Sequence, residues 1–269
     1  MLSPYRVRVP HLPSTSICSS TWKLTYSSSF RVLMELLFHS GFTMPWTEEQ
    51  FMESNNSDIS RVHFTIWEAG IGSPVDLENT THEHILRRTE IMRLLLILLS
   101  KPMYVTKETL CMSSMQALEF MTCELERPVV LSFLCSLLNT VANYRQAERW
   151  KILGADAVRD TYTSLCLEML CVLLSYQPAS KNSNLFLFYA RKLYRESDFL
   201  FLMNGTGKIF RESMAVTSGA FEMNNGRSTF VKAPEEHVSE MLVVIWTLIR
   251  TNSKLCETVT QSPRIAFDM

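Results

Sequence analysis

Glycine and net charge are both scarce in this sequence. Only 8 of the 269 residues are glycine, against an average usage of about 7%. Few tight turns are therefore expected, and abundant leucine and methionine favour helix because these side chains keep their rotamers there. The formal net charge of −1 argues against a general nucleic-acid binder, which would need a basic face. The 46% hydrophobic content excludes wholesale disorder.

Long hydrophobic runs are absent as well. No run reaches the roughly 18 to 20 apolar residues that a membrane-spanning helix needs. The longest, Leu94 to Leu99, is flanked by Arg93 and Lys101, so we expect a buried central helix there. N-myristoylation needs glycine at the second position, where this sequence has Leu2. The sequence therefore predicts neither a transmembrane segment nor this lipid anchor.

The motifs of catalysis and metal binding are missing too. No G-x-S-x-G elbow, H-E-x-x-H pair, paired-carboxylate motif or C-x-x-C pair occurs. His82 and His84 are the only close histidine pair, but residues two apart on a helix do not face each other and cannot share a metal. Gly205 to Lys208 lacks the spacing of a phosphate-binding loop, and we interpret it as a helix irregularity. We expect no catalytic residues, no metal ligands and no cofactor.

The seven cysteines follow no disulfide pattern. Their number is odd and most of them lie in apolar runs, whereas a disulfide framework would be denser and paired. We interpret them as free thiols that pack as small hydrophobic side chains, which suits a reducing cytosol.

Residues 1–29 have the composition of a tail. Their proline, serine and threonine show no periodicity, and no acidic residue precedes Glu35. This composition is shared by mitochondrial transit peptides, but Pro4, Pro10 and Pro13 would break an amphipathic helix. We interpret 1–29 as a disordered or unrelated tail, with mitochondrial import as an alternative. Residues 261–269 are expected to form a second, short tail.

Helical patterns fill the region 30–260. The expected helices are 30–38, 80–100, 109–125, 128–143, 160–173, 184–194, 197–210 and 234–249. Two of them match the apolar spacing i, i+3, i+4, i+7, i+8 and i+11. The matching residues are Tyr162, Leu165, Cys166, Met169, Leu170 and Leu173 in one, and Val238, Met241, Leu242, Ile245, Trp246 and Ile249 in the other. Helices with short links and no strand series predict an all-α fold of stacked hairpins, α-solenoid-like in the manner of HEAT or armadillo proteins.

Local signals set several of the expected boundaries. Thr80, with Glu83 three residues later, predicts a capping box at the start of a helix. Pro128 fits the first turn of another helix. The polar stretches 47–61 and 144–157 and the Gly, Asn and Ser-rich stretch 213–233 are expected to be loops.

Several segments, taken in order, resemble one family. Ile66 to Gly72 resembles its IWEAGVG signature, and Leu36 to Thr43 resembles its early LLF…FT helix end. The match continues through 88–104, 134–140, 184–199 and 240–254. Because the order is collinear over about residues 30–255, chance is a poor explanation. The sequence thus resembles the high-temperature-induced dauer-formation (Hid-type) family, a relative of dymeclin.

The resemblance implies a helical, non-enzymatic scaffold on the cytosolic face of the Golgi, acting in trans-Golgi sorting and secretory vesicle formation. It implies trafficking proteins as partners, peripheral contact with the Golgi membrane, and a cytoplasmic, Golgi-associated location. Family members are much longer, so 30–260 resembles a partial Hid-type region. Two alternatives stay open. One is a truncated or decayed member, and the other is an enzyme whose cryptic site gathers His82, His84, Glu68 and Asp76.

The family-signature residues are the candidate site. They are Ile66, Trp67, Glu68, Ala69, Gly70, Asp198 and Phe199. The sequence leaves their role open between a docking surface and a structural pin that fastens a loop to the core. An exposed Trp67 would favour docking, and a buried Trp67 would favour the pin.

Overall fold

The computed structural model describes residues 18–46, 61–73, 80–106, 108, 115–144, 156–178, 182–219 and 237–261. Within these ranges the regular elements are helices: α1 (Cys18–Leu37), α3 (His82–Leu99), η1 (Lys101–Tyr104), α5 (Gln116–Glu119), η2 (Phe120–Glu124), α6 (Arg127–Ala142), α7 (Asp156–Ser175), α8 (Leu185–Lys192), α9 (Glu196–Gly219), α10 (Val238–Thr251) and α11 (Ser253–Gln261). Extended backbone in the described ranges forms isolated bridges only. The all-α prediction is confirmed, and the solenoid-like stacking stays a prediction.

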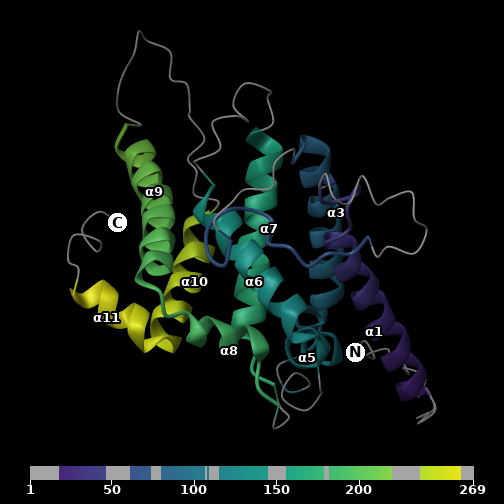
Figure 1. Cartoon of the computed structure of the whole chain (residues 1–269). Helices are drawn as coiled ribbons and strands as arrows, with labels where there is room; N and C mark the ends of the chain where they lie inside the picture. Colours follow the sequence, from purple (N-terminus) through teal and green to yellow (C-terminus); the bar gives the residue numbers. More distant parts are fainter. Residues whose placement is uncertain are drawn as a thin grey trace, which may run out of the picture.

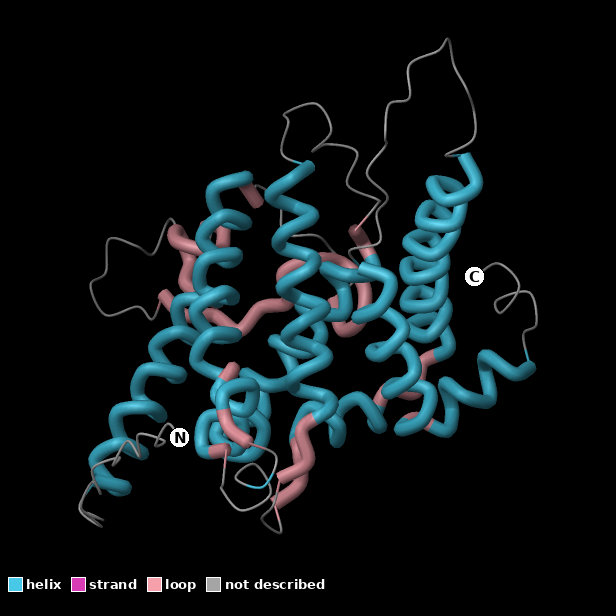
Figure 2. The backbone as a smooth tube through the Cα atoms, turned by 180° about the vertical axis from the view of Figure 1, so that it is seen from behind, coloured by secondary structure: helices cyan, strands magenta, loops and turns pink. Residues whose placement is uncertain are grey.

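Helix α7 is at the centre of the arrangement. It packs against α3 on one side and α10 on the other, and α6 crosses it and contacts α8 and α9 as well. Figure 1 places α1 and α3 at one end of the molecule and α9, α10 and α11 at the other. The extended stretch 61–73, which lies among the pink segments of Figure 2, runs across the helices instead of joining a sheet.

Helix α6 is almost entirely buried, and the prediction that α3 is a buried central helix is wrong. Nearly every α6 residue from Val129 to Ala142 is buried, whereas α3 leaves Leu94 44% and Ile97 67% exposed. Both helices are apolar around most of their circumference. Helix α6 is covered by α7, α8 and α9, while the described residues leave the outer face of α3 uncovered.

The apolar stripe predicted for α7 is confirmed, because all six of its residues are buried. The stripe predicted for α10 is partly wrong. Met241 and Ile245 are buried as expected, but Leu242 is 54% exposed and Trp246 is 65% exposed. Val244 and Leu248 take their places in the core. The buried face of α10 is therefore rotated, which moves two large apolar side chains to the surface.

Helix α1 begins inside the predicted tail. It starts at Cys18, so 18–29 is helical and the expected boundary at residue 30 is wrong. No proline or glycine lies between residues 14 and 37, so nothing in the backbone chemistry stops the helix short of this point. Residues 1–17 and the second predicted tail, apart from Gln261, lie outside the described residues, as do most of the loops predicted at 47–61 and 144–157.

Helix α9 is longer than predicted. It begins at Glu196, one residue before the expected cap at Ser197, and it runs to Gly219, so the first part of the loop predicted at 213–233 is helical. The stretch from Gly205 to Lys208 lies inside this helix, so the helical context predicted for it is confirmed. A Cβ built on Gly205 would lie 2.4 Å from the carbonyl oxygen of Ala142, so this glycine lets α6 and α9 approach closely.

Gly205→Ala is expected to lower the free energy of unfolding by about 1 to 3 kcal/mol, because overpacking forces the two helices apart. The sign is informative, since alanine is normally about 1 kcal/mol better than glycine inside a helix. Asn204→Ala is the matched control, because this neighbouring side chain is exposed and its replacement gains helix propensity without a clash. Urea denaturation measures both variants. Equal stabilisation by the two would contradict a close crossing.

The capping box of α3 lies one residue later than predicted. Thr81, and not Thr80, is the N-cap, and its partner is His84 instead of Glu83. The Thr81 N–H donates to His84 Nδ1 at 3.1 Å, and the His84 N–H donates to Thr81 Oγ1 at 3.4 Å. Glu83 forms an exposed ion pair with Arg87. Only Thr80 has a glutamate three residues later, so the sequence signal favoured the wrong threonine, and the backbone geometry places the cap at Thr81.

Protonation of His84 is expected to weaken this helix start. Burial, together with the charges of Arg88 and Arg87, lowers the pKa of His84 from 6.5. The unfolded chain therefore takes up the proton first, so the stability is present above pH 6.5 and is lost as the pH falls below it. His84→Gln keeps an N3 capping partner without titrating. The melting temperature is measured at about pH 8 and at about pH 5. Its drop between the two pH values should be smaller for this variant than for the wild type. An equal fall would contradict the role of His84.

Two further expectations concern thiols and the membrane. Among the described residues Cys123, Cys135, Cys166, Cys171 and Cys256 are free, as predicted. No single helix in the described ranges is long and apolar enough to cross a bilayer. Gln116–Glu124 and Arg127–Ala142 pass that test only as a pair, with a bend of 100° between them.

Candidate functional site

The signature loop, residues 66–71, lies across α6. The chain reaches it through an extended stretch in which Val62 bridges His39. The hydroxyl of Ser132 donates to the Phe64 carbonyl at 2.6 Å, and the Trp67 N–H donates to Ser136 Oγ at 3.2 Å. From Phe64 onward, side chains of α6 thus supply hydrogen bonds that a neighbouring strand would otherwise provide.

Asn139 of α6 fastens the loop most extensively. Its Oδ1 accepts from the Ile71 N–H at 2.8 Å, and its Nδ2 donates to the carbonyls of Glu68 at 2.9 Å and of Ile71 at 3.1 Å. One turn later, Asn143 Nδ2 donates to the Ala69 carbonyl at 2.8 Å. Buried backbone groups need such partners, and an amide side chain can satisfy donors and acceptors together.

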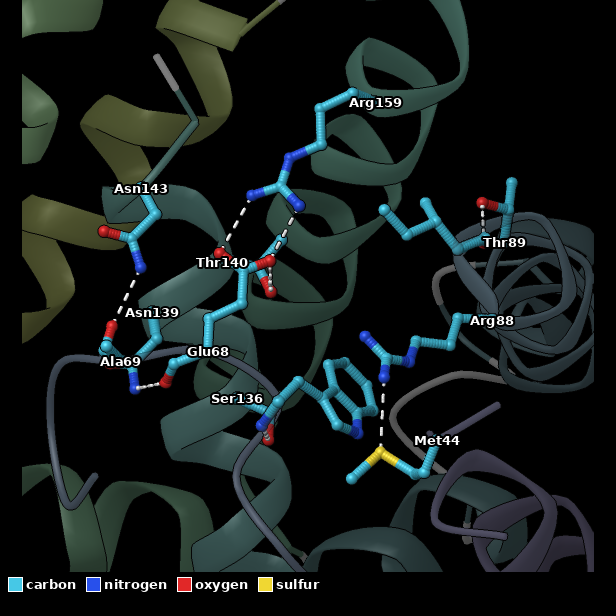
Figure 3. Close-up of polar contacts among 12 residues, drawn as sticks. Met44, Glu68, Ala69, Arg88, Thr89, Ser136, Asn139, Thr140, Asn143 and Arg159 are labelled. Atoms are coloured by element: carbon cyan, nitrogen blue, oxygen red, sulfur yellow. Dashed lines mark hydrogen bonds and ion pairs between the residues drawn. The ribbon is translucent and has the colours of Figure 1, made fainter. Parts of the chain in front are cut away.

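The side chain of Glu68 forms a buried ion pair with Arg159 of α7. Its Oε1 and Oε2 accept from Arg159 Nη1 and Nη2 at 2.7 and 2.9 Å, and Thr140 Oγ1 lies 3.4 Å from Oε1 (Figure 3). The two side chains are only 8% and 14% exposed. Burial by itself would raise the pKa of Glu68, but the charge and hydrogen bonds of Arg159 lower it below its ordinary value. Glu68 is therefore ionised and fully engaged.

Trp67 is buried, with 1% of its surface exposed. Its ring lies 5.5 Å from that of Phe38, 5.9 Å from that of Phe133 and 6.2 Å from that of Tyr162, measured between centroids. The guanidinium of Arg88 stacks 5.0 Å from the Trp67 ring, and its Nη2 donates to the Met44 sulfur at 3.2 Å. Because Trp67 touches residues that flank or belong to α1, α3, α6 and α7, its burial favours the structural pin.

Two glycines let the loop approach its neighbours. Gly70 and Gly72 have φ values of +142° and +75°, which L side chains rarely adopt. A Cβ on Gly70 would lie 2.6 Å from the Phe201 ring and 2.7 Å from Asn139 Oδ1. A Cβ on Gly72 would lie 2.8 Å from the end of the Ile66 side chain. A side chain at Gly70 would push the loop off α6, and one at Gly72 would force the Ile66 side chain to move.

The remaining signature residues lie in the first turn of α9. Phe199 is 1% exposed, and Asp198 is partly buried, which raises the pKa of its carboxyl group. Burial and the Asp198 charge raise the pKa of the Cys135 thiol on α6 to about 12. Asp198 therefore lies close to α6, and Phe201 of the same helix contacts the loop at Gly70. The structure brings the two signature segments together on α6.

The titratable side chains at this site are paired or buried, which limits the chemistry they can perform. The carboxylate of Glu68 is engaged by Arg159, and burial raises the pKa of the nearby Cys166 thiol, which keeps it protonated. The described residues contain no group of three or more His, Cys, Asp and Glu side chains that could hold a metal. His82 and His84 lie at the first turn of α3 and do not join Glu68, and Asp76 lies outside the described ranges.

The residues that hold the loop were missed by the sequence reasoning. A signal existed on α6, where Ser132, Ser136, Asn139 and Asn143 recur at helical spacing within an apolar helix. Arg159 and Arg88 gave no such signal, because Arg159 is 91 residues from Glu68 in the chain.

The fold and the site define an all-helical protein whose buried polar cluster fastens a loop across the buried helix α6. The model of the Hid1 family, the high-temperature-induced dauer-formation proteins, matches residues 22–268, and the chain belongs to this family.

Two curated relatives show how much of a family member this chain represents. The chain is 26% identical over 253 residues to the Ubp5-interacting protein ftp105 of Schizosaccharomyces pombe, an alignment that covers 86% of this chain and 25% of the relative. It is 27% identical over 259 residues to Protein HID1 of Homo sapiens, covering 86% of this chain and 31% of that protein. The chain thus spans about a quarter to a third of the length of these relatives. No solved structure matches it.

Proposed function

We propose that this chain is a non-enzymatic helical scaffold of the cytosolic face of the Golgi, acting in trans-Golgi sorting and secretory vesicle formation. The observation that carries the proposal is membership of the Hid1 family over residues 22–268. The proposed location is cytoplasmic and Golgi-associated, with peripheral contact to the membrane and trafficking proteins as partners.

The use of polar groups in the core supports a scaffold. The side chains of Glu68 and Arg159 pair with each other, and Asn139 bonds to the backbone of the signature loop. None of the three is left free to act on a substrate. The relative ftp105 is named for its interaction with Ubp5, which is a property of that relative. We propose protein binding for this chain as well, with partners of its own.

Localisation in cells tests this proposal. The full chain carrying a fluorescent tag is expected to concentrate at the Golgi, whereas the tag alone should spread through the cell. Proximity labelling from the same fusion is expected to recover trafficking proteins above the tag control. A uniform distribution together with no trafficking proteins would refute the proposal. A longer version of the reading frame belongs in the same experiment, because the relatives are three to four times longer than the stretch they share with this chain.

A decayed or truncated family member is the rival interpretation, and it predicts poor folding. The described residues share one contiguous hydrophobic cluster that joins α1, α3, α6, α7, α9 and α10. A shared core of this kind predicts one cooperative thermal transition for the purified chain. Calorimetry measures this transition. A broad, non-cooperative unfolding transition would support the rival interpretation instead.

A further inference from the structure

A groove runs along the outer face of α3 and α7. Its volume is about 820 Å³, and it lies between the C-terminal halves of the two helices, with η1 and α5 closing one end and the first turn of α10 reaching the other. Its lining is mainly apolar and includes Ile97, Met103, Tyr104 and Val172. This is the face of α3 that the sequence led us to expect in the core.

The walls of the groove stand open to solvent. Ile97 is 67% exposed, Met103 81% and Tyr104 82%. Scattered exposed apolar residues are ordinary, but a contiguous set beside a groove is typical of an interaction site. Methionine also suits a surface that adapts to a partner, because its side chain is flexible and polarisable.

Two carboxylates give the groove its charge. Glu168 of α7 and Glu240 of α10 both line it, and no lysine, arginine or histidine is among the lining residues. Burial raises the pKa of Glu168, and the charge of Glu240 raises it further. The described residues that surround Glu168 therefore supply repulsion without a compensating cation. A cationic group placed between the two carboxylates would remove this cost.

We propose that this groove binds an amphipathic helix of a partner protein, with apolar anchors against Ile97 and Val172 and a lysine or arginine between Glu168 and Glu240. Apolar anchors at helical spacing in a groove are a common mode of peptide recognition. The open walls suit a helix better than a small apolar ligand, which needs a pocket that buries most of its surface. The inference deepens the proposed scaffold function and rests on it for the partner being a protein.

A second copy of this chain is a poorer occupant. In a two-fold dimer the same patch meets itself, so Glu168 and Glu240 would face the same pair of carboxylates from the other subunit. Like charges placed together in an interface are strongly unfavourable. A helix from another protein carries no such constraint and can supply the missing cation.

A pair of designed peptides tests the proposal. The first is a fluorescently labelled amphipathic helix with leucines at i, i+3, i+4 and i+7 and a lysine beside that face, and the second has glutamate in place of the lysine. Fluorescence anisotropy with the full chain is expected to show the lysine peptide binding about tenfold or more tightly. The double variant Glu168→Gln/Glu240→Gln is expected to abolish most of this preference.

Two surface variants locate the binding. Ile97→Asp is expected to weaken binding of the lysine peptide about tenfold or more, and Leu86→Asp is the matched control, since Leu86 lies on the same helix outside the groove and is 37% exposed. Circular dichroism melts confirm that both variants fold, with Met103→Asp as a replacement for Ile97→Asp if needed. No binding of either peptide, equal binding of both, or binding that Ile97→Asp leaves unchanged would overturn the proposal. A dimer in light scattering that Ile97→Asp dissociates would overturn it too. Golgi localisation is a separate readout, so its failure is distinguishable from failure of the groove.

Discussion

Glu68→Ala is expected to lower the free energy of unfolding by about 3 to 5 kcal/mol, because it leaves the buried guanidinium of Arg159 without its counter-ion. Both side chains are nearly inaccessible, and the pair is bidentate, with contacts of 2.7 and 2.9 Å. Chemical denaturation of the purified chain measures the loss. The attraction between the charges matters less here than the penalty of burying one charge alone.

Two controls separate this effect from a general sensitivity to mutation. The double variant Glu68→Ala/Arg159→Ala removes both charges, so it is expected to cost less than the sum of the two single variants. Glu83→Ala breaks the exposed pair between Glu83 and Arg87. The Glu83 side chain is 67% exposed, so this variant is expected to cost about 1 kcal/mol or less. A loss as small for Glu68→Ala as for Glu83→Ala would contradict the buried pair.

The same ion pair predicts a pH dependence. Because Arg159 lowers the pKa of Glu68 below 4.5 in the folded chain, the unfolded chain takes up the proton first. The stability from this pair is therefore complete well above pH 4.5 and is lost as the pH falls through the folded value. The stability difference between wild type and Glu68→Ala should narrow in acid. A difference that is constant with pH would mean that Glu68 acts through packing alone.

Asn139→Ala is expected to cost about 3 to 5 kcal/mol, because it strips partners from three buried backbone groups at about 1 to 3 kcal/mol each. Those groups are the Ile71 N–H and the carbonyls of Ile71 and Glu68. The expected total lies below the upper sum because the loop can shift and reach water. Urea denaturation measures the cost.

A graded series controls for the Asn139 result. Ser132→Ala removes one hydrogen bond, to the Phe64 carbonyl, from the same row of α6 and is expected to cost about 1 kcal/mol. Asn139→Asp keeps the acceptor for the Ile71 N–H but replaces both donors with charge facing two carbonyls, so it is expected to be at least as damaging as alanine. A harmless Asn139→Asp would show that the amide donors do not hold the loop.

Helix positions followed from the sequence where one face alone is apolar. The six residues of the α7 stripe are all buried, and Pro128 lies in the first turn of α6 as predicted. Helices that are apolar around most of their circumference were harder, because periodicity cannot say which side is covered. This is why α3 was expected at the centre. It is also why Leu242 and Trp246 were assigned to the buried face of α10, although both are exposed.

The signature loop was located by sequence, but its role was not. Trp67 and Glu68 could be recognised by their resemblance to the family signature, yet their burial depends on neighbours distant in the sequence. The hydrogen-bonding row of α6 was readable as polar residues at helical spacing. Arg159 and Arg88 were not, because a charged residue near a helix start looks the same whether it faces solvent or a buried carboxylate.

Hydrogen exchange at the Trp67 and Ile71 amides tests most directly whether the signature loop is a structural pin. Both amides donate to α6 side chains, at 3.2 Å to Ser136 Oγ and at 2.8 Å to Asn139 Oδ1. If the loop is a pin, both amides should exchange only through opening events close to global unfolding, as slowly as the core amides of α6. Exchange at the rate of an unstructured peptide, with α6 still protected, would contradict the pin and favour a loop that is free to dock.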